Sequence, residues 1–246
     1  MKFDIIGDIH GCYNELLQLL DKLGYSLKSG LPVHPNGRKL AFVGDAMDRG
    51  SQSVETINFL YNLQDADLLI YSPGNHCNKF YRYAKGSNVQ ITHGLETTVK
   101  ELDLLATNER DQFLKRYVHF YNKLPLYHVL DDGKLIVVHA GIRKDMIGVK
   151  FTEKIRVFTQ YGDITGKKHP DGKPVRRDWA KQYKEEVFIV YGHTPVHDAR
   201  FINQTVNIDT GCVFGGKLTA IRYPEMEVIS VPSTMPYVKE KFTTFK

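Results

Sequence analysis

Cysteine is scarce in this chain: three occur among 246 residues, Cys12, Cys77 and Cys212. An odd and sparse set offers no disulfide framework, and no CxxC pair indicates a zinc site. Reduced thiols are the usual state of cysteine in a reducing compartment. We therefore expect three free thiols and a cytoplasmic protein.

Long hydrophobic runs are also absent, and none approaches the ~18 residues that a membrane span needs. The first apolar run, residues 3–6, ends at Asp8, which is not the pattern of a signal peptide. The charge excess is small, with 33 Lys and Arg against 28 Asp and Glu and a formal net charge of +5. No long Lys/Arg block occurs. The composition favours a soluble protein with anionic substrates, with no membrane, no nucleic acid and no obligatory protein partner.

No linker, repeat or low-complexity stretch divides the sequence. Hydrophobic residues make up 42% and charged residues 25% of it, which is ordinary globular usage. An α/β domain can reach this length, so we expect residues 1–246 to form one domain.

The first half of the chain alternates apolar strands with helical patterns. Strands are predicted at residues 3–7, 40–43 and 68–71, and helices follow the first two, with the second over about residues 53–63. Such β-α-β alternation is typical of a mainly parallel sheet with helices on both faces. One long helix is predicted over residues 93–123.

The second half reads mainly as strands. Residues 126–130 and 134–139 form a predicted hairpin around Asp131, Asp132 and Gly133. The polar segment 162–177 is predicted to be a loop or lid. The late strands at residues 187–191, 205–208, 218–223 and 228–231 are expected to build a second sheet.

Metal-ligand residue types follow five of the predicted strands, usually beside glycine. The candidates are Asp8, His10, Asp45, Asn75, His139 and His193. In open α/β sheets, ligands bind at the carboxyl ends of strands, so this pattern places all five clusters on one rim. One such residue alone is more often a cap or turn former; the ordered combination carries the prediction.

The residue types suit two divalent ions. Two ions about 3.5–4 Å apart can hold a phosphate and activate water at neutral pH. Mixed carboxylate and imidazole ligands suit manganese, iron, nickel or zinc better than magnesium or calcium. Asp8 and His10 can reach one ion, and Asp45 can bridge two. Asn75, His139 and His193 would complete the second site.

The motifs DIHG, GDAMDRG, GNHC, HAGI and GHT, in this order, resemble the phosphoprotein-phosphatase branch of the calcineurin-like metallophosphoesterases. The resemblance spans residues 4–209. It implies an α/β fold in which two mixed β-sheets form a sandwich flanked by helices. It also implies the same ligand set: Asp8, His10 and Asp45 for one metal, and Asp45, Asn75, His139 and His193 for the other.

Further segments resemble one bacterial subgroup, the bis(5′-nucleosyl)-tetraphosphatases of the PrpE type. They include GNHCNK, HGLET, RRDWA, YGHTPV and NIDTGCVFG. This resemblance implies asymmetric hydrolysis of diadenosine tetraphosphate to ATP and AMP, supported by nickel or manganese. The nucleophile would be a hydroxide held by the two metals, with no covalent enzyme intermediate. The alternative is a phosphoserine, phosphothreonine or phosphotyrosine protein phosphatase, which needs the same site.

The resemblance also implies a catalytic pair, with His76 as general acid and Asp48 orienting it. Arg49 would bind phosphate oxygens through its planar guanidinium. A second phosphate-binding arginine is expected, and the candidates are Arg177, Arg176 and, more weakly, Arg143.

Several residues keep two interpretations. Cys77 stands where most of the branch has an acid, and we interpret it as a small residue behind the ligands. Residues 80–83 and Trp179 could bind the phosphate chain or stack on a base, but packing is their more common role.

Overall fold

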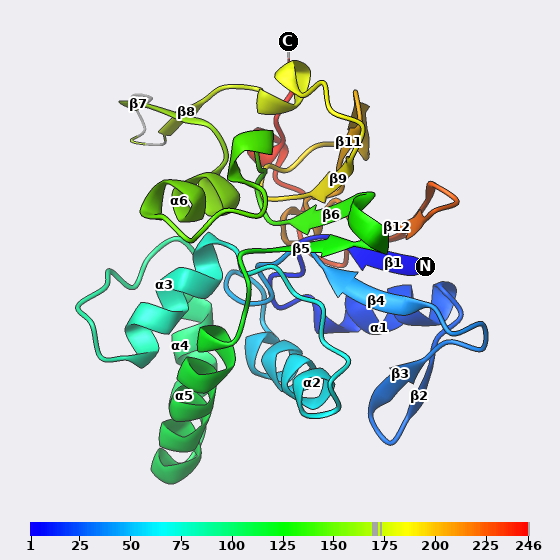
Figure 1. The fold of residues 1–246 in the computed structure, drawn as a ribbon. Helices are drawn as coiled ribbons and strands as arrows, with labels where there is room; N and C mark the ends of the chain where they lie inside the picture. The colour runs from blue at the N-terminus through cyan, green and yellow to red at the C-terminus, as the bar shows by residue number, and fades with distance from the viewer. Residues whose placement is uncertain (169–171, 173, 246) are drawn as a thin grey trace.

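Two mixed sheets face each other in the computed structural model, which describes residues 1–168, 172 and 174–245 (Figure 1). One has the strand order β13-β12-β1-β4 and the other the order β10-β11-β9-β6-β5. The first sheet consists of β1 (Phe3–Ile6), β4 (Lys39–Phe42), β12 (Lys217–Tyr223) and β13 (Glu227–Pro232). The second consists of β5 (Tyr127–Leu130), β6 (Leu135–Val138), β9 (Phe188–Tyr191), β10 (Arg200–Ile202) and β11 (Thr205–Asn207).

Successive side chains along each strand point to opposite faces of the sheet, and this alternation builds the sandwich. On β1, Phe3 and Ile5 enter the core between the two sheets, whereas Ile6 packs under the helices. On β6, Val137 faces the same inter-sheet core, and Val138 faces outward. Strands buried on both faces read as continuous apolar runs, which is why their sequences gave a clear signal. The predicted sandwich of two mixed sheets is confirmed.

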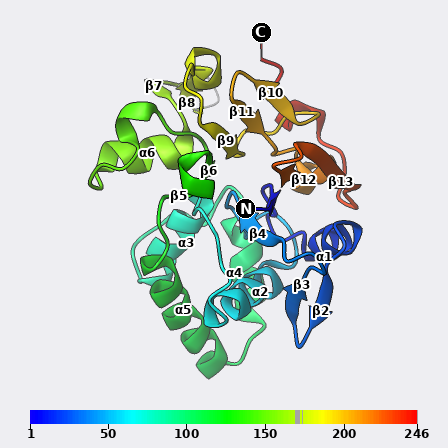
Figure 2. The same ribbon diagram turned by 45° about the vertical axis from the view of Figure 1, so that its right-hand side comes forward.

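Helices cover the outer faces (Figures 1 and 2). The core outside the first sheet draws residues from α1 to α5, and the core outside the second draws residues from α6. The bounds are α1 (Tyr13–Lys22), α2 (Ser53–Asp65), α3 (Asn75–Ala84), α4 (Leu95–Asp103), α5 (Thr107–Asn122) and α6 (Glu153–Tyr161). In the described part of the chain, no helix is long and apolar enough to cross a membrane.

The expectation that the late strands form a sheet of their own is wrong. β9 and β11 lie in the second sheet, but β12 and β13 belong to the first. β12 pairs antiparallel with β1, with Ile6 opposite Ala220. The first sheet is therefore mixed, and only its β1–β4 pair is parallel. A hydrophobic run shows that a strand is buried, but it does not specify the neighbouring strand.

The helix predicted over residues 93–123 is broken. α4 ends before Leu104, and α5 begins after Ala106, whose backbone is extended (φ −60°, ψ 148°). The N–H of Ala106 donates to Oε2 of Glu109 at 3.2 Å, so this side chain caps the new helix. The helical spacing of apolar residues continues across the break, so the sequence pattern gave no sign that the helix ends there.

Two other segments differ from prediction. Residues 68–71 form no strand, and Tyr71 makes only an isolated parallel bridge to Phe42. Segment 162–177 contains a ribbon of β7 (Ile164–Lys168) and β8 (Pro174–Arg176), while residues 169–171 and 173 lie outside the described residues. A two-stranded ribbon has little buried face, so its polar sequence resembled a loop. A similar small ribbon joins β2 (Ser26–Lys28) and β3 (Leu31–Val33).

Candidate metal centre

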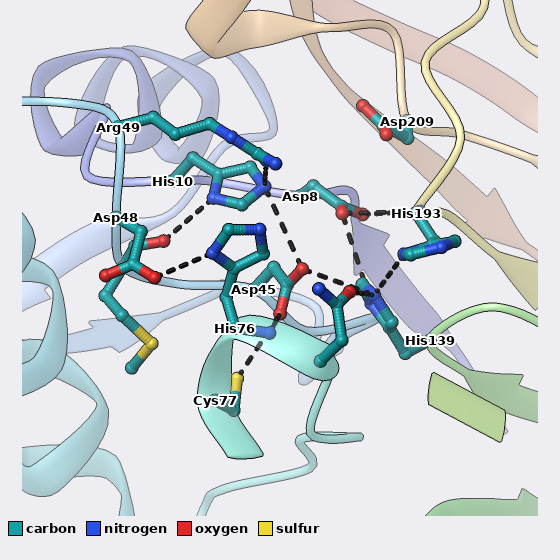
Figure 3. Close-up of polar contacts among 12 residues, drawn as sticks. Asp8, His10, Asp45, Asp48, Arg49, His76, Cys77, His139, His193 and Asp209 are labelled. Atoms are coloured by element: carbon teal, nitrogen blue, oxygen red, sulfur yellow. Dashed lines mark hydrogen bonds and ion pairs between the residues drawn. The ribbon is translucent and has the colours of Figure 1, made fainter. Parts of the chain in front are cut away.

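The six predicted ligands come from five loops that meet at one edge of the sandwich (Figure 3). Each loop follows a strand, except that Asn75 begins α3. The residues after β1 are Asp8 and His10, and those after β4, β6 and β9 are Asp45, His139 and His193. The structure brings all six together, as the strand-end pattern predicted.

Three donor atoms gather around Nε2 of His139. Nδ1 of His193 lies 3.0 Å away, and Oδ1 of Asn75 lies at 3.3 Å. Oδ2 of Asp45 is also at 3.3 Å. Two imidazole nitrogens, an amide oxygen and a carboxylate oxygen thus converge on one point. This is the donor set that a borderline divalent ion prefers.

Backbone carbonyls fix the ring orientation of two of the histidines. Nδ1 of His139 donates to the carbonyl of Val43 at 3.1 Å, and Nδ1 of His10 donates to that of Met47 at 2.8 Å. In each ring Nε2 therefore faces the site. Such outer hydrogen bonds are what orient metal-binding histidines in general.

Asp45 lies at the centre of the cluster. Two groups of potential ligands, each with its ligand atoms within 4.8 Å of one another, share it: His10 and His76 in one, His139 and His193 in the other. Oδ2 of Asp45 is 3.9 Å from Nε2 of His10, and Oδ1 accepts the N–H of His76 at 3.1 Å. Asp45 therefore lies between His10 on one side and His139 with His193 on the other, which is the position of a bridging ligand.

The backbone under the site is held in an unusual conformation. His10, Asp45, Asp48, Arg49 and His193 all have φ between 42° and 73°. Residues other than glycine seldom adopt this left-handed region, and such strain concentrates at functional sites. The strain supports a functional role for these loops independently of their residue types.

Two glycines leave space for the carboxylates. A Cβ on Gly74 would lie 2.1 Å from Oδ1 of Asp45, and one on Gly192 would lie 2.1 Å from Oδ1 of Asp8. Both positions therefore require glycine, as the Gly-Asn-His and Gly-His-Thr motifs indicated.

Asp209 is a further buried carboxylate near Asp8, and the sequence analysis did not single it out. It is 4% exposed, and burial raises its pKa to about 6. Burial, followed by the charge of Asp209, raises the pKa of the Asp8 carboxyl well above its usual range. The signal was present in the sequence, because Asp209 follows the apolar strand 205–208, but it carries no adjacent His or Asn.

The charges at the centre of the cluster favour ionised Asp45 and protonated His139. Burial acts to raise the pKa of Asp45, but the imidazoles of His139, His76 and His10 outweigh it and hold that pKa well below its usual range. Burial acts to lower the pKa of His139, but the carboxylates of Asp45 and Asp8 raise it to about 9.

The donor set fits divalent cations. The buried Asp8 and Asp209 carboxylates repel each other, and a cation beside them would relieve both that repulsion and the cost of burial. A metal would likewise take the place of the proton that His139 holds.

His76 lies beside the cluster and is held by Asp48. Nδ1 of His76 donates to Oδ2 of Asp48 at 2.7 Å, and Oγ1 of Thr98 donates to Oδ1 of Asp48 at 2.7 Å. The side chains of Asp48 and Thr98 are fully buried. The ring is therefore fixed with Nε2 as its free nitrogen.

The four predicted phosphate-binding arginines lie in different surroundings. Nη1 of Arg49 donates to Nε2 of His10 at 2.7 Å, so this guanidinium reaches the cluster and competes with a metal for that lone pair. Arg176 lines a cavity together with His193. Arg177 lines it too, but pairs with Asp163 at 3.1 Å. Arg143 pairs with Asp145 and lines a different cavity, which His193 does not border.

Of the residues with two interpretations, Phe80 and Trp179 pack into cores, whereas Arg82 is exposed. Trp179 is 8% exposed, and its Nε1 donates to the carbonyl of Ala140 at 3.0 Å. Phe80 is fully buried beside Tyr117. Sγ of Cys77 lies 3.6 Å from Oδ1 of Asp45, and burial raises the pKa of its thiol to about 12. Cys77 is therefore a neutral thiol behind Asp45.

Comparison with known proteins gives the family. The calcineurin-like phosphoesterase family matches residues 1–229. This chain belongs to the calcineurin-like phosphoesterases. Members of this family are metallophosphoesterases, and the two clusters of His and Asp agree with divalent metal binding. The family resemblance inferred from the motifs is confirmed.

A relative of this calcineurin-like phosphoesterase, from Geobacillus sp. (strain WCH70), is 60% identical over 245 residues and covers 100% of both chains. It is named bis(5′-nucleosyl)-tetraphosphatase PrpE [asymmetrical]. Among solved structures, a candidate diadenosine tetraphosphatase matches with a TM-score of 0.66 at 21% identity, covering 94% of this chain and 93% of its own. A protein-tyrosine phosphatase from a Shewanella species matches with a TM-score of 0.59 at 20% identity, covering 93% and 80%. At these identities the structures establish the fold alone.

Proposed function

We propose that this chain hydrolyses diadenosine tetraphosphate asymmetrically to ATP and AMP. The observation that carries the proposal is the full-length match, at 60% identity, to a relative named for this activity. The cluster supplies what the reaction needs: ligands for divalent ions, a histidine for proton transfer, and arginines for a polyphosphate.

The proposed metal ligands are those of the sequence analysis. Asp8, His10 and Asp45 would hold one ion, and Asp45, Asn75, His139 and His193 the other; nickel or manganese are the proposed ions. Bound there, two divalent ions would polarise the phosphoryl oxygens and activate water for attack. The convergence of donors on Nε2 of His139 and the central place of Asp45 support this assignment.

The residues beside the metals handle the proton and the charge. Nε2 of His76 is the proposed proton donor to the leaving oxygen, because Nδ1 is committed to Asp48. Arg49 and Arg176 lie next to opposite ligands, His10 and His193, and are the proposed phosphate-binding pair. Arg177 is a secondary candidate, whereas the pairing of Arg143 with Asp145 makes it the weakest.

Two further proposals concern the whole chain. Residues 1–246 form one domain, which the pairing of the first strand with the late strand β12 supports. The protein acts in the cytoplasm without an obligatory partner, which its three buried free cysteines support.

The test is product analysis. Protein stripped of metal is reloaded with manganese, nickel or cobalt, and incubated with diadenosine tetraphosphate. We expect ATP and AMP in equal amounts, and no activity from the Asp45→Asn variant prepared in the same way. Two ADP per substrate would contradict asymmetric cleavage. An untouched dinucleotide together with rapid turnover of phosphopeptides would assign the chain as a protein phosphatase.

A further inference from the structure

A cavity of about 340 Å³ opens directly beside His193. Besides Ala140 and the residues around His193 at the end of β9, its walls come from the end of α6 with the following loop (residues 161–163), the β8 region (residues 174–179), and the C-terminal residues 243–245. The cavity therefore borders the metal centre at His193, and Figure 3 shows His193 across the cluster from Arg49 and Asp48.

The C-terminal wall is anchored, and we call residues 237–245 the C-terminal strap. The ring of Phe242 stacks on His197 with centroids 4.8 Å apart and planes at 10°. The same ring occupies the space over Gly211, where a Cβ would lie 2.6 Å from its Cε1. The N–H of Thr243 donates to the carbonyl of Pro195 at 2.7 Å. The strap thus packs on the loop that follows His193, and Figure 2 shows it ending near β10.

Phe245 is fixed at the far wall of the cavity. The guanidinium of Arg200 lies 4.1 Å from the centroid of its ring, and Nη1 of Arg200 donates to Asp178 at 3.2 Å. The cation–π contact holds the ring in place, and the ion pair neutralises a carboxylate that borders the cavity.

The cavity is cationic on the side of the metal centre. Nε of Arg176 donates to the backbone carbonyl of Tyr161 at 2.8 Å, which holds the arginine side chain at the end of α6. Among the residues that the structure describes, no carboxylate lies within ion-pair distance of Arg176. Its charge is therefore available to a ligand, whereas Arg177 is offset by Asp163.

We propose that this cavity is a nucleoside subsite, which takes the base and ribose at the end of a polyphosphate chain that leaves the metals past Arg176. The inference rests on the proposed function and deepens it. The volume lies at the lower end of the about 300–1,000 Å³ of small-ligand pockets. Tyr161 and Phe245 supply aromatic rings, and base–aromatic stacking is a general means of holding a nucleotide without reading its sequence.

The walls favour a nucleoside over a peptide. A peptide strand is recognised along an open sheet edge or groove, through its backbone. Here the strap and the β8 region both border a small space, and the lining residues bring guanidinium, carboxylate and hydroxyl side chains to it. The carboxylate of Asp163 is placed to accept hydrogen bonds from ribose hydroxyls.

The test measures how much the nucleoside adds to binding. Calorimetry on the metal-loaded protein gives Kd for ATP and for inorganic tripolyphosphate, which carries the phosphates alone. We expect wild-type protein to bind ATP more tightly. Phe245→Ala should reduce the ratio of the two constants by about 5- to 160-fold, the range of a lost base–aromatic stack. Phe245→Trp should restore it.

The matched control is Phe151→Ala, since Phe151 is 65% exposed and lies outside the cavity. This variant should bind both ligands as the wild type does. Equal affinity of wild-type protein for ATP and tripolyphosphate would overturn the subsite, as would an unchanged ratio in Phe245→Ala. A ratio that is unchanged while phosphopeptide turnover falls would identify a peptide subsite. Because the readout is binding, it separates failure of the subsite from failure of the proposed hydrolysis.

Discussion

Oδ2 of Asp48 accepts the Nδ1–H of His76 at 2.7 Å, and this bond leaves Nε2 as the only nitrogen of the ring that can meet a substrate. Asp48 is itself held by Thr98 on its other oxygen. Two buried side chains, Asp48 and Thr98, thus fix the orientation of His76. A histidine on the surface would not require such a buried polar pair. We infer from it that His76 moves a proton, and not only that it fills space.

Replacing His76 tests this role. His76→Asn should lower kcat on diadenosine tetraphosphate by about 10²–10⁴-fold, the usual contribution of general acid–base catalysis. The defect should shrink on p-nitrophenyl phosphate, whose leaving group needs little protonation. Metal content, measured by elemental analysis, should stay near that of the wild type. Equal losses on both substrates, or loss of a metal ion, would argue against proton donation.

Asp48 should act through His76. Asp48→Asn keeps the size of the side chain but removes the charge that holds Nδ1–H, so we expect a loss in kcat no larger than that of His76→Asn. The double variant should be no worse than His76→Asn alone, since the two residues form one unit. Additive losses in this cycle would show that Asp48 has a separate role. Thr98→Val is the milder companion, because it keeps the Asp48–His76 pair and removes only the hydrogen bonds that Oγ1 of Thr98 makes to Asp48 and Ser53.

Asp45 should be the most sensitive ligand. Asp45→Asn removes the negative charge shared by both groups of donors, so both ions should be bound more weakly. Loss of a residue that only hydrogen-bonds a metal ligand lowers activity by about 10–100-fold. Asp45 is a proposed ligand itself, so we expect a larger fall in kcat. His10→Ala should be milder, because it belongs to one group only. Activity and bound metal are measured together. Wild-type kcat in Asp45→Asn would refute the bridging assignment.

The strand-end pattern predicted which side chains lie close together, but it did not predict which strands pair. Asp8, Asp45 and His139 stand directly after buried apolar runs, and their geometry depends only on where those strands end. The sheet to which β12 belongs depends instead on long-range pairing with β1, which no local pattern encodes. Asp209 was missed for a related reason: it approaches Asp8 from a late strand, and no His stands beside it in the sequence.

The arginines show the other limit of the sequence. Arg176 and Arg177 are adjacent and chemically equivalent there, yet the structure pairs Arg177 with Asp163 and leaves Arg176 beside His193. Which arginine is available to a substrate depends on carboxylates distant in sequence, so the motif alone could not rank them.

Metal dependence is the simplest prediction for the enzyme as a whole. Dialysis against a chelator should reduce hydrolysis to background, and manganese, nickel or cobalt should restore it, because mixed imidazole and carboxylate sites suit these ions. Magnesium and calcium should restore less. Full activity in excess chelator, with no metal found by elemental analysis, would exclude the proposed mechanism.

Gly74 and Gly86 flank α3, and replacing each of them should affect a different property of the protein: metal binding at position 74 and folding stability at position 86. Gly74 has ordinary backbone angles (φ −88°), but a Cβ there would lie 2.1 Å from Oδ1 of Asp45 and 2.6 Å from Cε1 of His139. Gly86 has the opposite character, since its φ is 75° and no atom lies within 4 Å of the added Cβ. An alanine at position 74 therefore displaces ligands, whereas one at position 86 strains only the backbone.

We accordingly expect Gly74→Ala to lose metal and activity, and Gly86→Ala to keep both. The cost at position 86 should be about 1–2 kcal/mol of left-handed backbone strain. In a chain of this size, such a cost lowers Tm by roughly 2–8 °C. Tm is measured in chelator so that metal binding does not contribute to it. A Gly74→Ala protein that binds two ions and turns over normally would show that the carboxylate of Asp45 can move away without loss, and the close packing around it would then have no part in catalysis.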